Sequence, residues 1–161
     1  ETSYLGTGSD NSGQLRIYDK RGETRSYLGD GYLQAYNQFG ERTIFLGIGT
    51  SGGGYLRTYN FSGQESIYVG TGADSSGQIR IYDNSGETGS FLGSGYFRTY
   101  NRFGKMTTFI GNATDGGGYL RTNNKFETET VFLGTNNANE GLINLNDKFG
   151  QSFWIRLNKK N

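Results

Sequence analysis

Polar and apolar residues alternate in short segments along the whole chain, and clusters of glycine separate these segments. Leu15-Arg16-Ile17-Tyr18 and Ile79-Arg80-Ile81-Tyr82 come before one kind of turn, and Ser26-Tyr27-Leu28 and Ser90-Phe91-Leu92 come after it. β-Branched and aromatic residues spaced two apart are typical of β-strands. No segment has the spacing of an amphipathic helix. The pattern therefore predicts an all-β protein.

The alternating segments form a tandem repeat. YLGTGSDNSGQLRIYDKRGETRS at 4–26 returns as YVGTGADSSGQIRIYDNSGETGS at 68–90, and each block of 64 residues contains units of 23, 18 and 23 residues. Repeats of this length bury their apolar faces against their neighbours. We therefore predict one repeat-array domain over 1–161, built from seven tandem 18/23-residue repeats. Their bounds are 4–26, 27–44, 45–67, 68–90, 91–108 and 109–131, followed by an atypical capping repeat at 132–161.

One turn recurs in almost every repeat. Six of the seven repeats carry Asn or Asp followed three residues later by Gly, as in Asp19…Gly22 and Asn37…Gly40. This spacing is typical of a three-residue hairpin loop with a bulge, in which the glycine takes a left-handed conformation. In the exception, Asn124…Glu127, a residue other than glycine must bear the strain or change the turn.

The turns also predict which residues face each other. A three-residue loop pairs Asp19 with Glu23, and regular pairing from there places Leu15 opposite Tyr27. The second turn of the short repeats, taken as Gly29-Asp30-Gly31, pairs Tyr27 with Leu33. One face should then carry a continuous apolar ladder. Its other pairs are Leu33–Phe45, Leu56–Tyr68, Ile79–Phe91, Phe97–Phe109, Leu120–Phe132 and Ile143–Ile155.

Two architectures explain this repeat. In a hairpin meander, about 14 short antiparallel strands follow one another and form an elongated or prism-like array. In a β-solenoid, each repeat forms one coil and like residues stack between coils. The meander is favoured because both kinds of turn agree on one register. The Trp-containing segment 153–157 departs from the repeat and is expected to cap its end.

The opposite face should carry tyrosine and arginine, together with Leu28, Leu46, Val69, Leu92, Ile110 and Leu133. These polar and aromatic side chains suit either of two roles. Tyr and Arg can pack along each other's flat sides, or they can form a platform on which sugar rings stack and are hydrogen-bonded. The candidate ligand- or partner-binding residues are Arg16, Tyr18, Tyr36, Arg57, Tyr59, Arg80, Tyr82, Arg98, Tyr100 and Arg121.

Composition removes several functional classes. The chain of 161 residues has a net charge of +1, which gives no general electrostatic case for binding nucleic acid or an anionic membrane. It has no Cys or His, which excludes thiol catalysis, imidazole-based triads and the usual zinc sites. Its carboxylates are spread evenly, so no pair stands out as catalytic, and we expect neither an enzyme nor a cofactor. Asp10, Asp74 and Asp115 are weak Ca²⁺ candidates in equivalent loops, although Asp in such loops more often stabilises the turn itself.

The repeated motif L-G-x-G-x-L-x-x-Y-N-x-x-G, over about residues 4–150, resembles the short Gly/Asn-rich β-repeats of phage tail fibres and spikes and of bacterial surface proteins. The resemblance implies an elongated, often homotrimeric protein with a mechanical or adhesive role. We therefore expect a non-enzymatic structural or adhesive module of an extracellular, cell-surface or virion fibre, self-associating through its repeat faces. The alternative is a multivalent carbohydrate-binding module that uses the Tyr/Arg rows. The expected partners are further copies of the chain and, in the alternative, glycans, with no nucleic acid and no membrane insertion.

Overall fold

The computed structural model describes residues 2–50, 52–114, 116–136 and 138–157, with only the backbone described for 154–157. It contains fifteen β-strands, and no helix occurs in those ranges. The prediction of an all-β protein is confirmed, although the count of strands is one higher than expected because Ser3–Thr7 forms a strand of its own. Within the same ranges there is thus no apolar helix of membrane-spanning length. The side chains on which an end cap at 154–157 depends lie outside this description.

Two compact units, residues 1–86 and 87–161, make up the chain, and each is described by itself. Unit 1 contains β1 (Ser3–Thr7), β2 (Gly13–Tyr18), β3 (Thr24–Gly29), β4 (Tyr32–Tyr36), β5 (Arg42–Ile48), β6 (Gly54–Tyr59), β7 (Glu65–Thr71) and β8 (Gly77–Tyr82). Unit 2 contains β9 (Thr88–Gly93), β10 (Tyr96–Tyr100), β11 (Met106–Asn112), β12 (Gly118–Asn123), β13 (Glu129–Thr135), β14 (Gly141–Asn146) and β15 (Ser152–Leu157).

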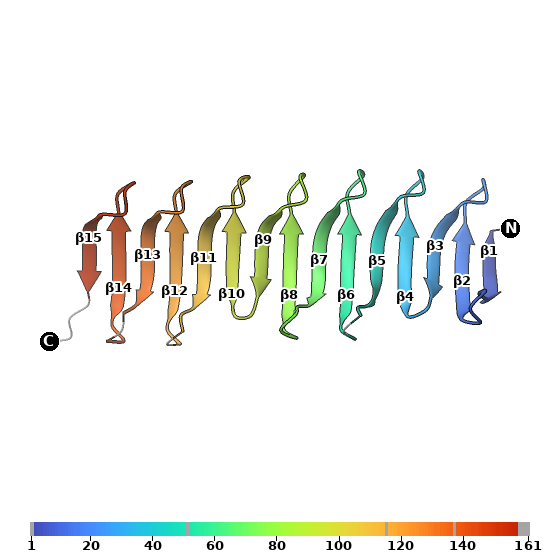
Figure 1. The fold of residues 1–161 in the computed structure, drawn as a ribbon, viewed down its shortest axis with the longest axis horizontal. Helices are drawn as coiled ribbons and strands as arrows, with labels where there is room; N and C mark the ends of the chain where they lie inside the picture. Colours follow the sequence, from blue (N-terminus) through green and yellow to red (C-terminus); the bar gives the residue numbers. More distant parts are fainter. Residues whose placement is uncertain (1, 51, 115, 137, 158–161) are drawn as a thin grey trace. The chain divides into compact units, whose positions relative to one another are not determined.

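Within each unit, consecutive strands pair antiparallel and form one open sheet. The turns that follow even-numbered strands lie at one end of the strands, and those that follow odd-numbered strands lie at the other (Figure 1). This is the hairpin arrangement, so the β-solenoid is not the architecture of either unit.

The recurring Asn/Asp…Gly turn has the expected three-residue geometry. The Asp19 N–H donates to the Glu23 carbonyl oxygen at 2.9 Å, and the Gly22 N–H donates to the Asp19 carbonyl oxygen at 3.0 Å. Gly22 has a φ of +81°, a region that glycine enters without a steric penalty. In the exceptional turn Glu127 itself takes a φ of +67°, and its carboxylate accepts a hydrogen bond from Lys105 Nζ at 2.7 Å. The turn is therefore kept and Glu127 bears the strain.

The predicted register is wrong by one residue, because a β-bulge follows the recurring Asn/Asp turn in each hairpin described within the units. In the first hairpin Tyr18 pairs with Thr24 but Ile17 pairs with Ser26, so Arg25 is the extra residue. Equivalent shifts occur after β4, β6, β10, β12 and β14. A bulge places two residues opposite one, which moves every later side chain to the other face. Leu15 consequently faces Leu28, and Tyr27 faces Arg16.

The second turn of the short repeats also differs from its predicted form. It is a two-residue turn in which Gly29 pairs with Tyr32 and both Asp30 (φ 51°) and Gly31 (φ 77°) have positive φ values. Two positive values are characteristic of the type I′ hairpin turn. The pair Tyr27–Leu33 is therefore replaced by Leu28–Leu33.

The bulges sort the side chains into two chemically distinct faces. One, called here the aliphatic face, carries Leu5, Leu15, Ile17, Leu28, Leu33, Ile44, Leu46, Leu56, Ile67, Val69, Ile79 and Ile81 in unit 1, and Leu92, Phe97, Ile110, Leu120, Val131, Leu133, Ile143 and Leu145 in unit 2. The other, the aromatic face, carries the Tyr and Arg candidates together with Tyr27, Phe45, Tyr68, Phe91, Phe109 and Phe132. Leu28, Leu46, Val69, Leu92, Ile110 and Leu133, expected beside the tyrosines, thus lie on the opposite face.

Neither unit has a conventional core. Among the side chains that the structure describes, Phe109 is the only buried hydrophobic one, at 5% exposure. Each unit is a single layer of sheet, whose aromatic face gains much of its packing from rings that lie over glycine. An added Cβ at Gly70 would stand 2.5 Å from the Cβ of Tyr55 and 2.9 Å from the Gly54 carbonyl oxygen, so only glycine fits there.

Replacing one of these glycines should destabilise unit 1 strongly. We expect Gly70→Ala to lower the free energy of unfolding by about 1–3 kcal/mol, since the new methyl group overlaps Tyr55. Gly77→Ala is the matched control, because no atom lies within 4 Å of its added Cβ, and its effect should stay below about 1 kcal/mol. Urea unfolding followed by circular dichroism measures both values. Equal effects from the two substitutions would contradict this account of the packing.

Candidate functional site

Five aromatic rings form a continuous stack across the aromatic face of unit 1. Tyr27, Tyr32, Phe45, Tyr55 and Tyr68 come from the five consecutive strands β3 to β7. Their ring centroids are 5.2, 5.4, 5.1 and 5.9 Å apart in that order, and all but the first contact are near-parallel. Offset ring pairs at such distances contribute about 0.5–1.5 kcal/mol each beyond the area that they bury. The stack therefore stiffens a sheet that has no second layer.

Unit 2 repeats the same stack with Phe91, Tyr96, Phe109, Tyr119 and Phe132, from strands β9 to β13. The centroids are 5.2, 5.5, 4.6 and 5.4 Å apart. Rings from odd-numbered and even-numbered strands alternate along the stack. The rings on even-numbered strands, Tyr96 and Tyr119, lie directly opposite glycines of the neighbouring strands, and each of these glycines follows a Leu or an Ile.

Arginine side chains lie over these rings. The Arg57 guanidinium carbon is 4.8 Å from the ring centroid of Tyr55 and 5.5 Å from that of Tyr68. In unit 2 the Arg98 carbon is 4.2 Å from the centroid of Tyr96 and 5.4 Å from that of Phe109. Cation–π contacts of this kind are typical of arginine on aromatic rings. The packing role proposed from the sequence is thus present, and the sugar platform stays a prediction.

One carboxylate, that of Glu65, contacts an arginine of the aromatic face in unit 1. Arg57 Nε and Glu65 Oε2 are 3.3 Å apart. Burial is the largest single influence on Arg57 and opposes its charged form, but the charge of Glu65, together with hydrogen bonding to Tyr59 and the charges of Tyr55 and Tyr59, raises the pKa of Arg57 above its ordinary value. Burial, followed by the charge of Glu65, also raises the pKa of Tyr82. Tyr82 therefore stays protonated near neutral pH and can donate a hydrogen bond.

The ring stack of unit 1 is bounded by glutamine. Gln14 on β2 and Gln78 on β8 occupy the strand position that Tyr55 occupies on β6, because each pairs with a glycine of a neighbouring strand. Beside each glutamine the aromatic face is hollowed. The first hollow has a volume of about 420 Å³ and the second about 310 Å³.

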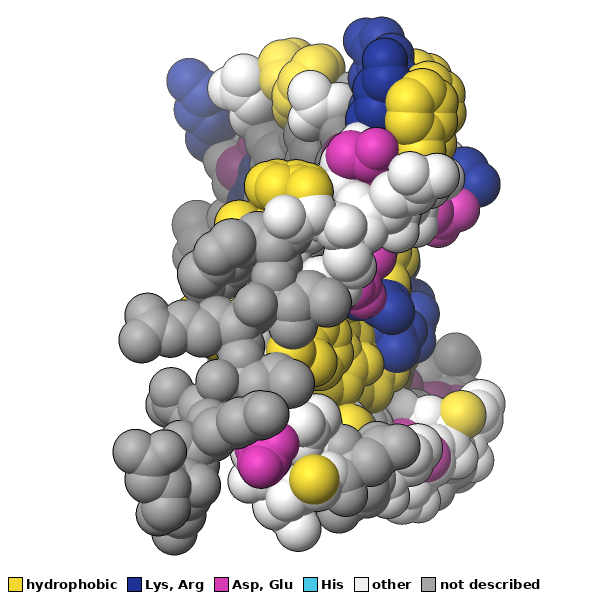
Figure 2. Space-filling view, turned by 90° about the vertical axis from the view of Figure 1, so that its left-hand side faces the viewer, with side chains coloured by type: hydrophobic (Ala, Val, Ile, Leu, Met, Phe, Trp, Pro, Cys, Tyr) yellow, Lys and Arg dark blue, Asp and Glu magenta, His cyan; other side chains and the backbone are white. Residues whose placement is uncertain are grey.

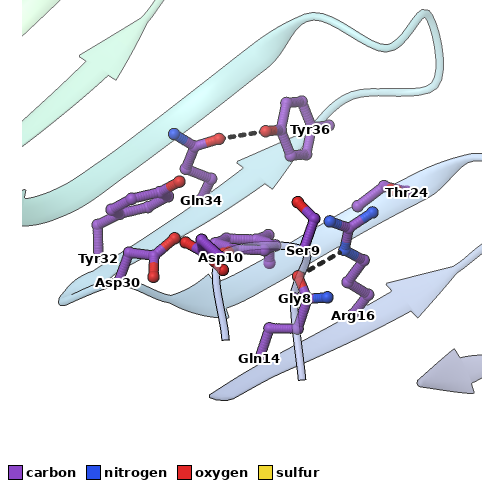
Figure 3. A pocket seen from close by; sticks show the side chains of 11 residues that line it. Gly8, Ser9, Asp10, Gln14, Arg16, Thr24, Asp30, Tyr32, Gln34 and Tyr36 are labelled. Atoms are coloured by element: carbon purple, nitrogen blue, oxygen red, sulfur yellow. Dashed lines mark hydrogen bonds between the residues drawn. The ribbon is translucent and has the colours of Figure 1, made fainter. Parts of the chain in front are cut away.

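The first hollow is lined by polar side chains from β2, β3 and β4 and the turns beside them (Figure 3). Gln14, only 9% exposed, accepts a hydrogen bond from Arg16 Nε on its Oε1 at 3.1 Å. Tyr27 donates its hydroxyl hydrogen to Asp30 Oδ2 at 3.1 Å. Burial, followed by hydrogen bonding to Asp30 and Tyr32, raises the pKa of Tyr27 to about 12.

The second hollow lies beside the last ring of the stack. It is lined by side chains of β6, β7 and β8, among them Arg57, Glu65, Tyr68, Gln78 and Arg80. The backbone pairing places Arg57 and Arg80 directly opposite Tyr68, one on each neighbouring strand. Arg80 Nη2 donates to Gln78 Oε1 at 3.3 Å, which repeats the Arg–Gln contact of the first hollow.

The long-loop aspartates act locally in the described part of the chain. The Asp10 carboxylate accepts hydrogen bonds from the Ser12 backbone N–H and hydroxyl, at 3.1 and 2.8 Å, and Asp74 accepts the same pair from Ser76, at 3.1 and 2.6 Å. Among the described residues no three acidic side chains come together as a metal site. Asp115, the third Ca²⁺ candidate, lies outside the described residues.

The ten candidate residues all lie on strands, with their side chains on the aromatic face of their own unit. Unit 1 holds Arg16, Tyr18, Tyr36, Arg57, Tyr59, Arg80 and Tyr82, and unit 2 holds Arg98, Tyr100 and Arg121. Sequence reasoning missed the rings of the odd-numbered strands, which it placed on the other face, and the two glutamines. The glycine after each Leu, Ile or Val is the signal that could have placed these rings, because a ring needs that space.

A second exposed feature lies at the tips of the three-residue turns. Phe61 is 86% exposed, and Phe39, Phe103, Phe126 and Phe149 are also mostly exposed. Three of these rings carry an adjacent cation, and the distances from Arg102, Lys125 and Lys148 to the neighbouring ring centroid are 4.8, 4.9 and 4.9 Å. In the end-on view of Figure 2, hydrophobic side chains lie beside Lys and Arg side chains at the top, where these turns lie. Within each unit the turn tips thus carry exposed apolar groups outside the sheet faces, and in unit 2 basic groups lie beside them.

No protein-family model matches this chain, and no curated protein matches it in sequence.

The raised pKa of Tyr27 predicts a loss of stability at high pH. The folded protein holds this proton more tightly than the unfolded chain, so the contribution is complete below pH 10, the ordinary value, and is lost as the pH rises to about 12. Ultraviolet difference spectroscopy of the protein and of Tyr27→Phe should identify one tyrosine that ionises last. Asp30→Asn should lower that pKa, because a negative neighbour is removed. An unchanged titration curve in Tyr27→Phe would contradict the assignment.

Proposed function

We propose that this chain is a non-enzymatic structural or adhesive module that self-associates through its aliphatic face, as part of an extracellular, cell-surface or virion fibre. The observation that supports this most is the aliphatic face itself. It runs across every strand of unit 1 and is half-exposed, with Ile17 at 45%, Leu28 at 50% and Leu46 at 51% exposure. In unit 2, Leu92 and Leu133 have similar values of 49% and 48%. Contiguous apolar faces of this kind mark sites of protein association.

The area of the face suits a protein partner. Ten of its side chains in unit 1 are at least 36% exposed and share one face, the kind of extended apolar surface that a standard interface of about 800 Å² per partner covers. Burial of apolar surface stabilises the folded state by roughly 25 cal/mol per Å². A partner that covers this face would therefore supply the apolar burial that a hydrophobic core provides in other proteins. The face carries no charged side chain at its central positions, which are taken by Leu, Ile, Val and one Phe.

A second copy of the chain is the occupant that fits best. Side chains on the face recur with the spacing of the strands, so two such faces can interdigitate over many equivalent positions. Sheets packed face to face lie about 10 Å apart, a distance that Leu and Ile side chains from both faces fill. Homo-oligomers with closed symmetry are also the commonest assemblies of soluble proteins. The aromatic face and the turn tips remain outside this interface and are available for contact with other surfaces.

A lysine in the centre of the face should disrupt the assembly. Leu46→Lys buries an unpaired charge in the interface and should raise the dissociation constant at least about tenfold, as measured by sedimentation equilibrium. Phe61→Lys is the control, because it replaces an even more exposed apolar side chain at a turn tip, outside the aliphatic face, and should leave the dissociation constant unchanged.

The unchanged protein provides a second measurement, in case Leu46→Lys fails to fold. Its midpoint of thermal unfolding should rise with protein concentration, since folding and association are linked. A protein that sediments as a folded monomer at all concentrations, with a midpoint independent of concentration, would rule out the proposal.

A further inference from the structure

We propose that the first hollow, beside Gln14, binds an amino sugar, a hexopyranose that carries a protonated primary amine. This inference goes beyond self-association and depends on the aromatic face of unit 1 alone. It rests on three observations: a hollow lined by tyrosine rings, two aspartates at one side of it that have no ion-pair partner in the described part of the chain, and a buried glutamine whose amide group lines it.

The hollow has room for one sugar ring and offers aromatic rings on which the sugar can pack. Its volume of about 420 Å³ lies within the range of small-ligand sites, about 300–1,000 Å³. Tyr27, Tyr32 and Tyr36 line it, and the ring centroids of the first two are 5.2 Å apart. The C–H face of a pyranose packs on the electron-rich face of such rings, which also attracts a cation.

Two carboxylates line the hollow from neighbouring turns. Asp10 lies in the loop between β1 and β2, and Asp30 lies in the turn between β3 and β4. Figure 3 shows the two side chains next to each other on one side of the hollow, with Arg16 on the other side. Within the described ranges neither carboxylate forms an ion pair, whereas Asp19 and Glu65 of the same unit both do. A bound cation would supply the missing partner.

One oxygen of each carboxylate is left for a ligand. Asp10 accepts hydrogen bonds from Ser12 on Oδ1, and Asp30 accepts one from Tyr27 on Oδ2. No other described residue donates a hydrogen bond to Asp10 Oδ2 or to Asp30 Oδ1. A primary ammonium group has three N–H donors and a positive charge, and its hydrogen bonds to carboxylates are charge-assisted. The amine of the sugar therefore belongs on the aspartate side of the hollow.

Gln14 is the buried polar group of the hollow. Its side chain is only 9% exposed, and its Oε1 accepts a hydrogen bond from Arg16 Nε at 3.1 Å. Its Nε2 donates to no residue in the described ranges, although buried amide groups are normally hydrogen-bonded. A hydroxyl oxygen of the sugar would accept from this Nε2. Thr24 and Gln34, which also line the hollow, add groups for the remaining sugar hydroxyls.

The second 64-residue block carries a different set of residues at the equivalent sequence positions. Ser94 stands where the first block has Asp30, so one carboxylate is missing. Arg98 stands where the first block has Gln34, which adds a positive charge. Both differences disfavour an ammonium ligand. We therefore expect one amino-sugar site in each chain.

Titration of the full chain, followed by nuclear magnetic resonance, tests the proposal. The probes are glucosamine, galactosamine and mannosamine, in a buffer acidic enough to keep their amines protonated. The controls are glucose, galactose and mannose, which carry a hydroxyl in place of the amine. At least one amino sugar should bind about tenfold or more tightly than its parent hexose. The largest shifts of backbone amide signals should fall within residues 8–16 and 27–36.

Variants of the two aspartates test the role of charge. Asp30→Asn should weaken binding of the amino sugar about tenfold or more, while the midpoint of thermal unfolding changes little, because Asn-Gly also suits a type I′ turn. Asp10→Asn should weaken binding too, since Asn keeps the turn to Ser12 but loses the charge. Asp74→Asn is the matched control, because Asp74 is the equivalent of Asp10 in the second block, and binding should stay unchanged.

Three results would overturn the proposal: no amino sugar binds, each binds no more tightly than its parent hexose, or folded Asp30→Asn binds as tightly as the original chain. Calcium chloride is titrated separately, because carboxylates also bind Ca²⁺. Tighter binding of Ca²⁺ than of any amino sugar at these residues would assign the hollow to an ion and would likewise overturn the proposal. None of these results bears on sedimentation, so self-association through the aliphatic face is judged separately.

Discussion

One extra residue after each recurring Asn/Asp turn described within the units determines which side chains share a face. The turn fixes the pairing of Asp19 with Glu23, and the bulge at Arg25 then shifts the strand by one position. Without that shift leucines would face tyrosines, and both faces would be mixed. With it, aliphatic side chains gather on one face and rings with arginines on the other. The shift recurs at Thr43, Ser66, Thr107 and Thr130, so the division holds along each unit.

The two faces of this single-layer sheet differ in how their side chains are packed. The aromatic face stabilises itself, because large rings lie over glycine and contact each other from strand to strand, with arginine across them. The aliphatic face has branched side chains too short to cover one another, and they stay half-exposed. Intramolecular packing therefore accounts for one face only. The other face carries exposed apolar area, which is the physical basis for the proposed self-association.

Local chemistry could be predicted from the sequence, and long-range register could not. The alternation predicted strands, and Asn37…Gly40 and its equivalents predicted three-residue turns that the structure contains. A bulge has no comparable signature in the sequence. Ser66 and Thr107 look like ordinary strand residues until the pairing with the neighbouring strand is known. Asp30-Gly31 was also compatible with two turn lengths. Because Tyr27 and Leu28 exchange faces with one shift, the alternation of side chains by itself did not predict the ring stack or the hollow at Gln78.

A second copy is proposed to cover the aliphatic face while the turn tips stay open to solvent. Methyl nuclear magnetic resonance with a soluble paramagnetic probe tests it directly, because the probe speeds relaxation only where it can approach. The account predicts weak enhancement at the methyl groups of Leu28 and Leu46 and strong enhancement at the ring protons of Phe61. Equal, strong enhancement at all three residues in the native protein would show that the face is bare and would contradict the account.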